Sequence, residues 1–292
     1  MPTVDLPQGR VNYRIAGPPD STLPPVVFVH GLLVNGEMWT GVAAALAERG
    51  IRSYTPDLPL GAHTVAMKPG ADISPRGVAR IVLSFLEALD LAGVTLAGND
   101  TGGALCQFVI DTDSSRIGRL VLTNCDAFDQ FPPPPGGLMM KLISGPVRLR
   151  LAAGPLRWTA VRHSPVAYGP FTARPLDAEL TRRWVTPLLT DAGVREDTAR
   201  FMRGIRPASL LDVSTRLGAF TRPVLLLWGT GDRFFKLSLG RRLAQAFPDA
   251  RLIEVEGGHT FLPLDEPDRI ASEISTFLVP ALGHSLAIPN VP

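Results

Sequence analysis

The sequence predicts an α/β fold with a mainly parallel sheet, and two observations lead to this class. Short β-rich runs alternate with helical patterns over the first third of the chain and again after residue 219. Between these parts, the run Phe131-Pro132-Pro133-Pro134-Pro135-Gly136-Gly137 breaks the alternation, because neither a helix nor a central strand continues through it. Alternating strands and helices pack as a parallel sheet with helices on both faces.

The elements of the first part are expected in a definite order. A β-hairpin over residues 4–15 opens the chain, and apolar residues at helical spacing over 39–46 and 78–89 predict two helices that pack on the sheet. The other strands are apolar runs of the kind that is covered on both faces, and they span residues 25–29, 52–55, 94–97 and 119–124.

A helical insertion is expected after the proline run. Residues 132–218 are punctuated by prolines and contain no convincing strand, which predicts a cap of short helices. The α/β core is then formed by residues 1–131 and 219–280, and residues 281–292 form a loose tail. The cap holds 13 basic and 6 acidic residues, a net charge of +7. We interpret this excess as solvated helix faces, with attraction of an anionic substrate as the alternative.

The last part of the core is expected to continue the alternation. Strands are predicted at residues 224–228 and 251–255, each followed by a helical pattern, at 239–247 and 270–278. Because the core resumes after the cap, the sheet is assembled from two segments that are far apart in the sequence.

Composition excludes several classes of protein. The chain has 292 residues, of which 45% are hydrophobic and 19% charged, as is typical of a globular protein and not of a disordered one. A net charge of +2 without a lysine-rich tract argues against nucleic acid as a partner. No apolar run approaches the ~18 residues that cross a bilayer, so no membrane partner is expected. A monomer or a homodimer is compatible with this composition.

Cysteine usage and the N-terminus indicate a compartment. The first residues show no secretory pattern, and the two cysteines, Cys106 and Cys125, are expected to be small buried residues rather than a disulfide. We therefore expect a reducing, cytoplasmic location.

The central chemical feature is a tight turn between a strand and a helix. The segment Gly98-Asn99-Asp100-Thr101-Gly102-Gly103 follows the strand at 94–97 and precedes a helical pattern. Flanking glycines leave room for a strained turn that lifts its central residue to the C-terminal edge of the sheet. That residue is Asp100, the candidate nucleophile.

Two further side chains follow later strands, first an acid and then a histidine. Asp232 comes after the strand at 224–228, and His259 comes after the next strand. An imidazole serves as a general base when an acceptor holds its other nitrogen, and Asp232 is the expected acceptor. At the end of the strand at 119–124, the side chains of Asn124, Cys125 and Asp126 could line the pocket floor or hinge the cap.

The loop after the strand at 25–29 is expected to supply a hydrogen-bond donor. This loop begins His30-Gly31-Leu32. The backbone N–H groups of Leu32 and of Thr101, which follows the nucleophile, are expected to form an oxyanion hole. His30 itself is interpreted as a structural hydrogen-bonding residue and Asp57 as a residue that shapes a loop.

Together these segments resemble the α/β-hydrolase superfamily over essentially the whole chain. The resemblance implies an α/β-hydrolase fold, a mostly parallel sheet flanked by helices with an inserted helical cap. Most relatives carry serine in the turn, and aspartate there is similar to the epoxide hydrolase and haloalkane dehalogenase branch. Some dehalogenases place the acid that orients the histidine after the strand at 119–124, so the resemblance makes Asp126 the alternative acceptor to Asp232. The motifs that carry the resemblance are His30-Gly31, Asp57-Leu58-Pro59, Gly98-Asn99-Asp100-Thr101-Gly102-Gly103, Trp228-Gly229 with Asp232, and Gly258-His259.

Aspartate changes the expected reaction. A carboxylate with a reference pKa of about 3.9 is ionised at neutral pH, so the histidine is not needed for the first step. Attack on a saturated carbon would give an alkyl ester of Asp100, and water activated by His259 would then hydrolyse that ester. No metal and no organic cofactor is required by this chemistry.

The leaving group separates the possible substrates. In the resembled families, cap tyrosines protonate an opened epoxide, and Tyr168 is the tyrosine of this cap. Dehalogenases commonly carry tryptophan where this chain has Thr101 and asparagine where it has Leu32. Trp158 and Trp184 could donate N–H groups to a halide or simply pack.

Three functions follow, in order of preference. The first is an epoxide hydrolase acting on an apolar small molecule, and the second is a haloalkane dehalogenase. The third is of another class, a binding protein of this fold that is non-catalytic or acts without covalent attack, in which Asp100 would be a relic. Retention of both Asp232 and His259 argues against the third.

Overall fold

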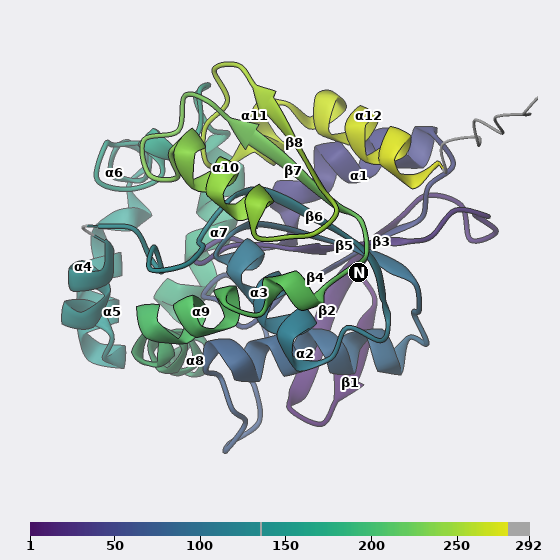
Figure 1. Ribbon diagram of the computed structural model, residues 1–292. Helices are drawn as coiled ribbons and strands as arrows, with labels where there is room; N and C mark the ends of the chain where they lie inside the picture. Colours follow the sequence, from purple (N-terminus) through teal and green to yellow (C-terminus); the bar gives the residue numbers. More distant parts are fainter. Residues whose placement is uncertain (135, 280–292) are drawn as a thin grey trace, which may run out of the picture.

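An eight-stranded sheet, in the order β1-β2-β4-β3-β5-β6-β7-β8, forms the centre of the molecule (Figure 1). The computed structural model describes residues 1–134 and 136–279. β1 pairs antiparallel with β2, as β2 does with β4, and every later pair is parallel. The strands are β1 (Thr3–Leu6), β2 (Gly9–Ala16), β3 (Val26–Val29), β4 (Ser53–Pro56), β5 (Val94–Asp100), β6 (Ile117–Cys125), β7 (Val224–Gly229) and β8 (Ala250–Val255).

Helices cover both faces of this sheet. α1 and α12 pack together on one face, whereas α2 and α3 pack together on the other, which α10 also covers (Figure 1). The helices of the core are η1 (Gly36–Trp39), α1 (Thr40–Glu48), α2 (Pro75–Ala88), α3 (Thr101–Thr112), α10 (Leu237–Gln245), α11 (Leu262–Asp265) and α12 (Pro267–Leu278).

A helical insertion separates β6 from β7 and lies on the left of Figure 1. Its helices span residues 136–219, and no strand occurs among the described residues between them. They are α4 (Gly136–Ile143), α5 (Pro146–Ala153), η2 (Gly154–Arg157), α6 (Thr159–Arg162), η3 (Gly169–Phe171), α7 (Ala178–Thr190), α8 (Ala192–Gly204), α9 (Pro207–Ser214) and η4 (Leu217–Ala219).

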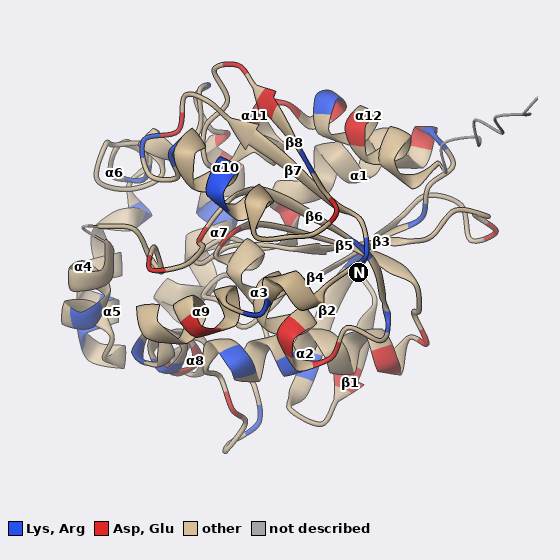
Figure 2. Ribbon diagram, viewed as in Figure 1, with Lys and Arg blue, Asp and Glu red and all other residues tan. Residues whose placement is uncertain are grey.

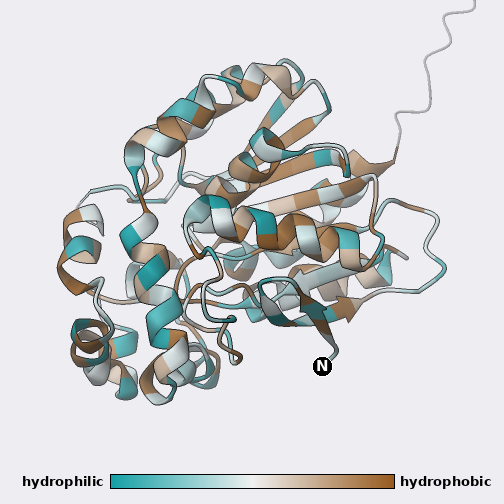
Figure 3. Cartoon of the chain, turned by 90° about the horizontal axis from the view of Figure 1, so that it is seen from below, coloured by the Kyte–Doolittle hydropathy of each residue, from teal (hydrophilic) through white to brown (hydrophobic). Residues whose placement is uncertain are grey.

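The core is built from strands that are buried on both sides. All four residues of β3 are buried, and its side chains alternate between two hydrophobic clusters, with Val27 and Val29 in one and Val26 and Phe28 in the other. Figure 3 shows hydrophobic residues along the strands and along the helices that cover them. This arrangement explains why the central strands are uninterrupted apolar runs.

The fold class predicted from the sequence is confirmed, including the inserted helical segment. Two elements differ in detail. β5 continues to Asp100, so the candidate nucleophile is the last residue of the strand, and α10 ends at Gln245, so Phe247 lies beyond the helix although it is still buried. Cys106 and Cys125 are buried and unpaired, as expected. The proposed tail at 281–292 lies outside the described residues.

Within residues 1–134 and 136–279, no helix combines the length and the apolar character that crossing a bilayer requires.

Candidate active site

Asp100 occupies the sharp turn between β5 and α3. β5 ends at Asp100 and α3 begins at Thr101. The Asp100 backbone has φ 54° and ψ −132°, a conformation that costs a non-glycine residue on the order of 1–3 kcal/mol. A Cβ atom on Gly98 would collide with the carbonyl of Gly102, and one on Gly102 would collide with the backbone at the end of β3. The turn therefore depends on both glycines, as the sequence predicts.

Burial raises the pKa of the Asp100 carboxyl group to about 7. The backbone N–H groups of Thr101 and Leu32 lower this pKa as hydrogen-bond donors, and the charge of Asp232 raises it. Gly31 packs on the same carboxyl group so closely that a Cβ atom there would collide with it. The two amides expected for the oxyanion hole thus lie at Asp100. Burial thus opposes the ionised form of Asp100 that the sequence led us to expect.

His30 holds the loop that carries Leu32. The backbone N–H of Leu58 donates to His30 Nε2 at 2.8 Å, and His30 Nδ1 lies 2.9 Å from the Gly31 carbonyl oxygen. Burial lowers the pKa of His30 to about 4, so the ring is neutral and its Nδ1–H donates to Gly31. This is the structural role that the sequence indicates for His30.

Asp57, which directly follows β4, stabilises the start of η1. Its Oδ1 accepts hydrogen bonds from Arg14 Nη1 at 2.6 Å and from the Gly36 backbone N–H at 3.0 Å. Because Gly36 begins η1, Asp57 joins that helix to β2, which carries Arg14. Asp57 therefore shapes a loop and does not take part in the candidate catalytic group.

His259 lies in the loop after β8. Its backbone N–H donates to Asp265 Oδ2 at 3.1 Å. The imidazole packs on Gly231, where a Cβ atom would lie 2.8 Å from Cδ2 and 3.0 Å from Nε2 of the ring. Nδ1 is buried and has no hydrogen-bond partner among the described residues. The nitrogen that an acid is expected to hold is therefore unpaired here.

Asp232 is buried, and its acceptor positions are filled by groups other than His259. A carboxylate offers about four acceptor positions. Burial raises the pKa of Asp232, against the lowering effect of its donors. Among the described residues no hydrogen bond joins Asp232 to His259. The four donors to Asp232 are the backbone N–H groups of Phe234 (2.7 Å) and Phe235 (3.1 Å) on Oδ1, and Asn124 Nδ2 (2.8 Å) and the Thr260 hydroxyl (3.0 Å) on Oδ2.

Asn124 links the ends of β6 and β7, a role that sequence reasoning missed. Its Oδ1 accepts from the Gly229 backbone N–H at 2.7 Å, and its Nδ2 donates both to the Gly229 carbonyl at 3.1 Å and to Asp232. The available signal was a polar residue at the carboxyl end of a buried strand, because such a residue needs partners from the neighbouring strand. Asn124 positions Asp232 rather than lining a pocket floor.

Asp126 lies beside Asp100 and is also buried, with neither carboxyl oxygen hydrogen-bonded within the described chain. Its backbone N–H donates to the Asp100 carbonyl at 3.4 Å, and its own carbonyl accepts from Gln107 Nε2 at 2.9 Å. Burial and the charge of Asp100 raise the pKa of Asp126 well above its usual value, and the Thr101 side chain opposes this. These effects favour the protonated form of Asp126, and within the described chain Asp126 makes no hydrogen bond to His259.

Tyr168 and Trp184 are packed together in the insertion, and both polar groups have partners. Their rings are 5.4 Å apart in a T-shaped contact. The Tyr168 hydroxyl donates to the Leu33 carbonyl at 2.7 Å, and Trp184 Nε1 donates to Asn35 Oδ1 at 3.0 Å. Burial raises the pKa of the Tyr168 phenol. Both side chains hold the loop after β3 and leave no donor free for a departing group.

Trp158, the third aromatic candidate in the insertion, is on the surface. Its side chain is 53% exposed, and the Arg157 guanidinium lies 4.2 Å from its ring centre. An indole with this exposure does not line an enclosed pocket. Trp158 is therefore removed from the candidate site.

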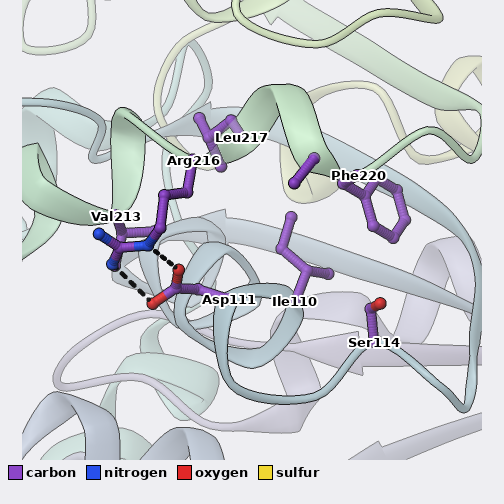
Figure 4. A pocket seen from close by; sticks show the side chains of 8 residues that line it. Ile110, Asp111, Ser114, Val213, Arg216, Leu217 and Phe220 are labelled. Atoms are coloured by element: carbon purple, nitrogen blue, oxygen red, sulfur yellow. Dashed lines mark hydrogen bonds and ion pairs between the residues drawn. The ribbon is translucent and has the colours of Figure 1, made fainter.

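Two cavities lie away from Asp100. One, of about 240 Å³, lies between the end of α3 and α9, where Arg216 Nε donates to Asp111 at 2.7 Å (Figure 4). Asp111 is about 16 Å along α3 from Asp100, at 1.5 Å per residue. The other, of about 520 Å³, is lined by Glu37 and Arg183 near η1 and α7. Neither is lined by Asp100 or His259, so neither is assigned to the substrate.

Most of the chain is similar in sequence to known proteins. A model of the alpha/beta hydrolase family matches residues 26–273. Haloalkane dehalogenase 2 of Mycobacterium tuberculosis is 28% identical over 282 residues, which is 92% of each protein. A 2-hydroxy-6-oxononadienedioate/2-hydroxy-6-oxononatrienedioate hydrolase of Dechloromonas aromatica is 29% identical over 177 residues, 60% of this chain and 58% of that protein.

Solved structures share the arrangement of strands and helices. The haloalkane dehalogenase DbeA of Bradyrhizobium elkani superposes with a TM-score of 0.76 and 19% identity, over 94% of this chain and 96% of that one. A thermophilic esterase of Thermogutta terrifontis gives 0.72 and 20%, over 95% and 98%. These likenesses establish the fold. Together with the family match over most of the sequence, they show that this chain is a member of the alpha/beta hydrolase family.

Proposed function

We propose that this protein is a hydrolase of the haloalkane dehalogenase type, with Asp100 as the nucleophile. The observation that carries the proposal is a carboxyl group at the strained strand–helix turn, with the Leu32 and Thr101 amides directed at it. Support for halogenated substrates comes from the relative named haloalkane dehalogenase 2, which is similar over 92% of the chain. This reverses the preference for epoxides that the sequence alone suggested.

The first step forms an ester. A carboxylate oxygen of Asp100 attacks the saturated carbon that bears the halogen, the carbon–halogen bond breaks, and the halide leaves with the bonding electron pair. The step requires the charged form of Asp100, whose pKa is about 7. No proton is transferred in this step, so His259 is not required for it.

The second step hydrolyses the ester. Water adds to the ester carbonyl carbon of Asp100 while His259 accepts a proton from that water, and the Leu32 and Thr101 amides stabilise the oxyanion. Collapse of the oxyanion expels the alkoxide, which takes up the proton held by His259 and leaves as the alcohol. The carboxylic acid formed at Asp100 then loses the remaining water proton to solvent, which regenerates the carboxylate. Asp232 is proposed to hold His259 during this step, which requires a hydrogen bond that the present arrangement does not make.

The hydrogen-bond donors near Asp100 argue against epoxides as substrates. They also limit which halides can leave readily. An opened epoxide needs a proton donor, but the Tyr168 hydroxyl is committed to Leu33. For the halide, Thr101 and Leu32 stand where related dehalogenases carry tryptophan and asparagine donors. With less stabilisation of the departing ion, reactivity should depend strongly on the leaving group. We therefore expect iodides and bromides of small apolar molecules to react well before chlorides.

Halide release tests the proposal directly. Purified protein is incubated with 1-iodobutane, 1-bromobutane, 1-chlorobutane and styrene oxide, and both halide and alcohol or diol are quantified. Halide and alcohol in equal amounts, in the order iodide, bromide, chloride and lost in Asp100→Asn, would support the proposal. Formation of diol from styrene oxide, without halide release from the haloalkanes, would establish an epoxide hydrolase instead. No product and no covalent adduct with any substrate would favour a binding protein.

A further inference from the structure

The outer helices of the insertion expose an unusual number of large apolar side chains. Six of the eleven exposed large hydrophobic residues of the described chain lie between residues 138 and 158. α4 buries none of its residues, and it packs beside α5 at one end of the molecule (Figures 1 and 3). We call these six residues the cap patch: Leu138 (68% exposed), Met139 (53%), Leu142 (62%), Val147 (70%), Leu151 (73%) and Trp158 (53%).

Spacing along each helix places the apolar side chains on common faces. Residues three and four positions apart lie close together on a helix, which groups Leu138 and Met139 with Leu142 on α4 and Val147 with Leu151 on α5. Large apolar side chains gathered on exposed helix faces in this way mark an interaction site.

The cap patch is surrounded by positive charge that nothing in the described chain neutralises. Residues 130–176 contain six basic residues and no aspartate or glutamate. Figure 2 shows blue without red on α4 and α5. By contrast, exposed arginines of α7 are paired, Arg182 with Glu179 and Arg183 with Glu37. The exposed basic residues beside the patch that form no ion pair with a described residue are Lys141, Arg148, Arg150 and Arg157.

From the exposed apolar side chains and the unpaired charge together, we propose that the cap patch binds the surface of a lipid bilayer that contains anionic headgroups. An apolar face rimmed by lysine and arginine lies in the plane of the membrane interface, with its side chains among the acyl chains and its cations at the headgroups. A second copy of this chain is a poorer occupant, because two such faces would bring positive charges together.

Trp158 and Arg157 mark the edge of this surface. The guanidinium stacks on the indole at 4.2 Å, and both side chains are exposed. Tryptophan concentrates at membrane interfaces, where its ring lies at the level of the headgroups, and arginine keeps its charge in water while its stem covers apolar surface. The pair therefore has the composition expected where the patch meets the headgroup layer.

This inference is independent of the proposed reaction and departs from the expectation, drawn from the sequence, that the protein has no membrane partner. A search for a long apolar run looks for a segment that spans a membrane, and the cap patch is discontinuous in sequence. Its residues lie on neighbouring elements, because α4 packs against α5 and α5 packs against η2, which Trp158 directly follows.

Trp158 provides an intrinsic probe for the experiment. The other three tryptophans, Trp39, Trp184 and Trp228, are fully buried, so a change in solvent exposure at the patch is reported by Trp158. The full chain is titrated with vesicles of phosphatidylcholine and phosphatidylglycerol in equal parts, and with phosphatidylcholine alone. We expect co-sedimentation and a blue shift of the emission with the anionic vesicles, weakened by added salt, and no blue shift in Trp158→Phe.

Matched variants separate binding through the cap patch from nonspecific binding to vesicles. The apolar variant carries both Leu142→Ser and Leu151→Ser. Its control carries Leu211→Ser and Val279→Ser, which alter exposed apolar residues elsewhere. Each cation at the surface contributes about a fivefold factor in affinity, so removing three should weaken binding about a hundredfold. The charge variant is Lys141→Gln, Arg148→Gln and Arg150→Gln, and its control, on other faces, is Arg49→Gln, Lys68→Gln and Arg251→Gln.

The outcomes decide the proposal. Loss of vesicle binding in the two patch variants but not in their controls, with circular dichroism unchanged, supports it. Absence of binding to anionic vesicles overturns it, as does equal loss in patch and control variants. A concentration-dependent dimer in sedimentation velocity that Leu142→Ser with Leu151→Ser dissolves would assign the face to a second copy and also overturn it.

Discussion

The Thr260 hydroxyl donates a hydrogen bond of 3.0 Å to Asp232 Oδ2. Thr260 directly follows His259, the residue that Asp232 is proposed to hold, so the threonine occupies an acceptor position that the imidazole would use. The His259 Nδ1 atom is correspondingly buried without a partner in the described part of the chain. Exchange of these two donors on Asp232 would convert the observed arrangement into one competent for ester hydrolysis.

Replacing Thr260 with valine should therefore favour the contact between His259 and Asp232. We expect the rate of ester hydrolysis to be unchanged or a few-fold higher, at a cost of about 1 kcal/mol in unfolding free energy for the lost hydrogen bond. Rapid-quench measurement of ester decay and urea unfolding check the two parts. Asp232→Asn is the matched comparison, and it should slow ester decay severely. A Thr260→Val enzyme as slow as Asp232→Asn would assign the catalytic contact to the threonine.

The pH dependence of ester formation follows from the pKa of Asp100. Burial raises this pKa to about 7, and only the charged carboxylate attacks. The single-turnover rate of halide release should rise about tenfold per pH unit well below 7 and level off above it. Stopped-flow detection of halide between pH 5 and pH 9 checks the profile. A rate that stays constant down to pH 5 would contradict the raised pKa.

Asp126→Asn distinguishes the two acids of the site. Burial and the charge of Asp100 raise the pKa of the Asp126 carboxyl group, which favours its neutral form, so a neutral amide of the same shape should be tolerated. We expect less than a threefold change in the rate of ester hydrolysis and little change in the pH profile of ester formation, because one neutral group replaces another. If Asp126 instead orients His259, ester decay will fall by orders of magnitude.

Tyr168→Phe tests whether the phenol takes part in the chemistry. The hydroxyl donates to the Leu33 carbonyl at 2.7 Å, in a backbone conformation with φ 61° at Leu33. Removing it should reduce stability by about 1–2 kcal/mol, because a carbonyl loses its donor, and should change halide release only a few-fold. Thermal unfolding and steady-state halide assays measure both. A loss of diol formation by a factor of a hundred or more would restore Tyr168 as a proton donor to epoxides.

Local sequence patterns predict the parts of the candidate site that depend on residues adjacent in the sequence. The turn at Asp100 is specified by the glycines on either side of it, and the positions of Asp232 and His259 follow from strand ends that meet at one edge of a parallel sheet. Leu32 was placed in the same way, because it follows β3. These inferences needed only the order of strands and the chemistry of short loops.

Contacts between distant loops were not predictable in this way. The hydrogen bonds of Asn124 and Thr260 to Asp232 depend on how the end of β6 and the loops after β7 and β8 approach one another, and polar residues there have many possible partners. Tryptophans of the insertion were ambiguous for a similar reason. Trp184 is fully buried and Trp158 is 53% exposed, although each directly follows an arginine in the sequence. Burial of such residues is decided by which helix packs on which.

The central claim is that Asp100 forms a covalent ester, and mass spectrometry of His259→Gln tests it most directly. This variant is incubated with 1-bromobutane, digested and analysed for the peptide that contains Asp100. The account predicts release of one bromide per chain and one butyl group on Asp100, because ester hydrolysis is arrested. Bromide release with an unmodified Asp100, or a butyl group on another residue, would contradict it.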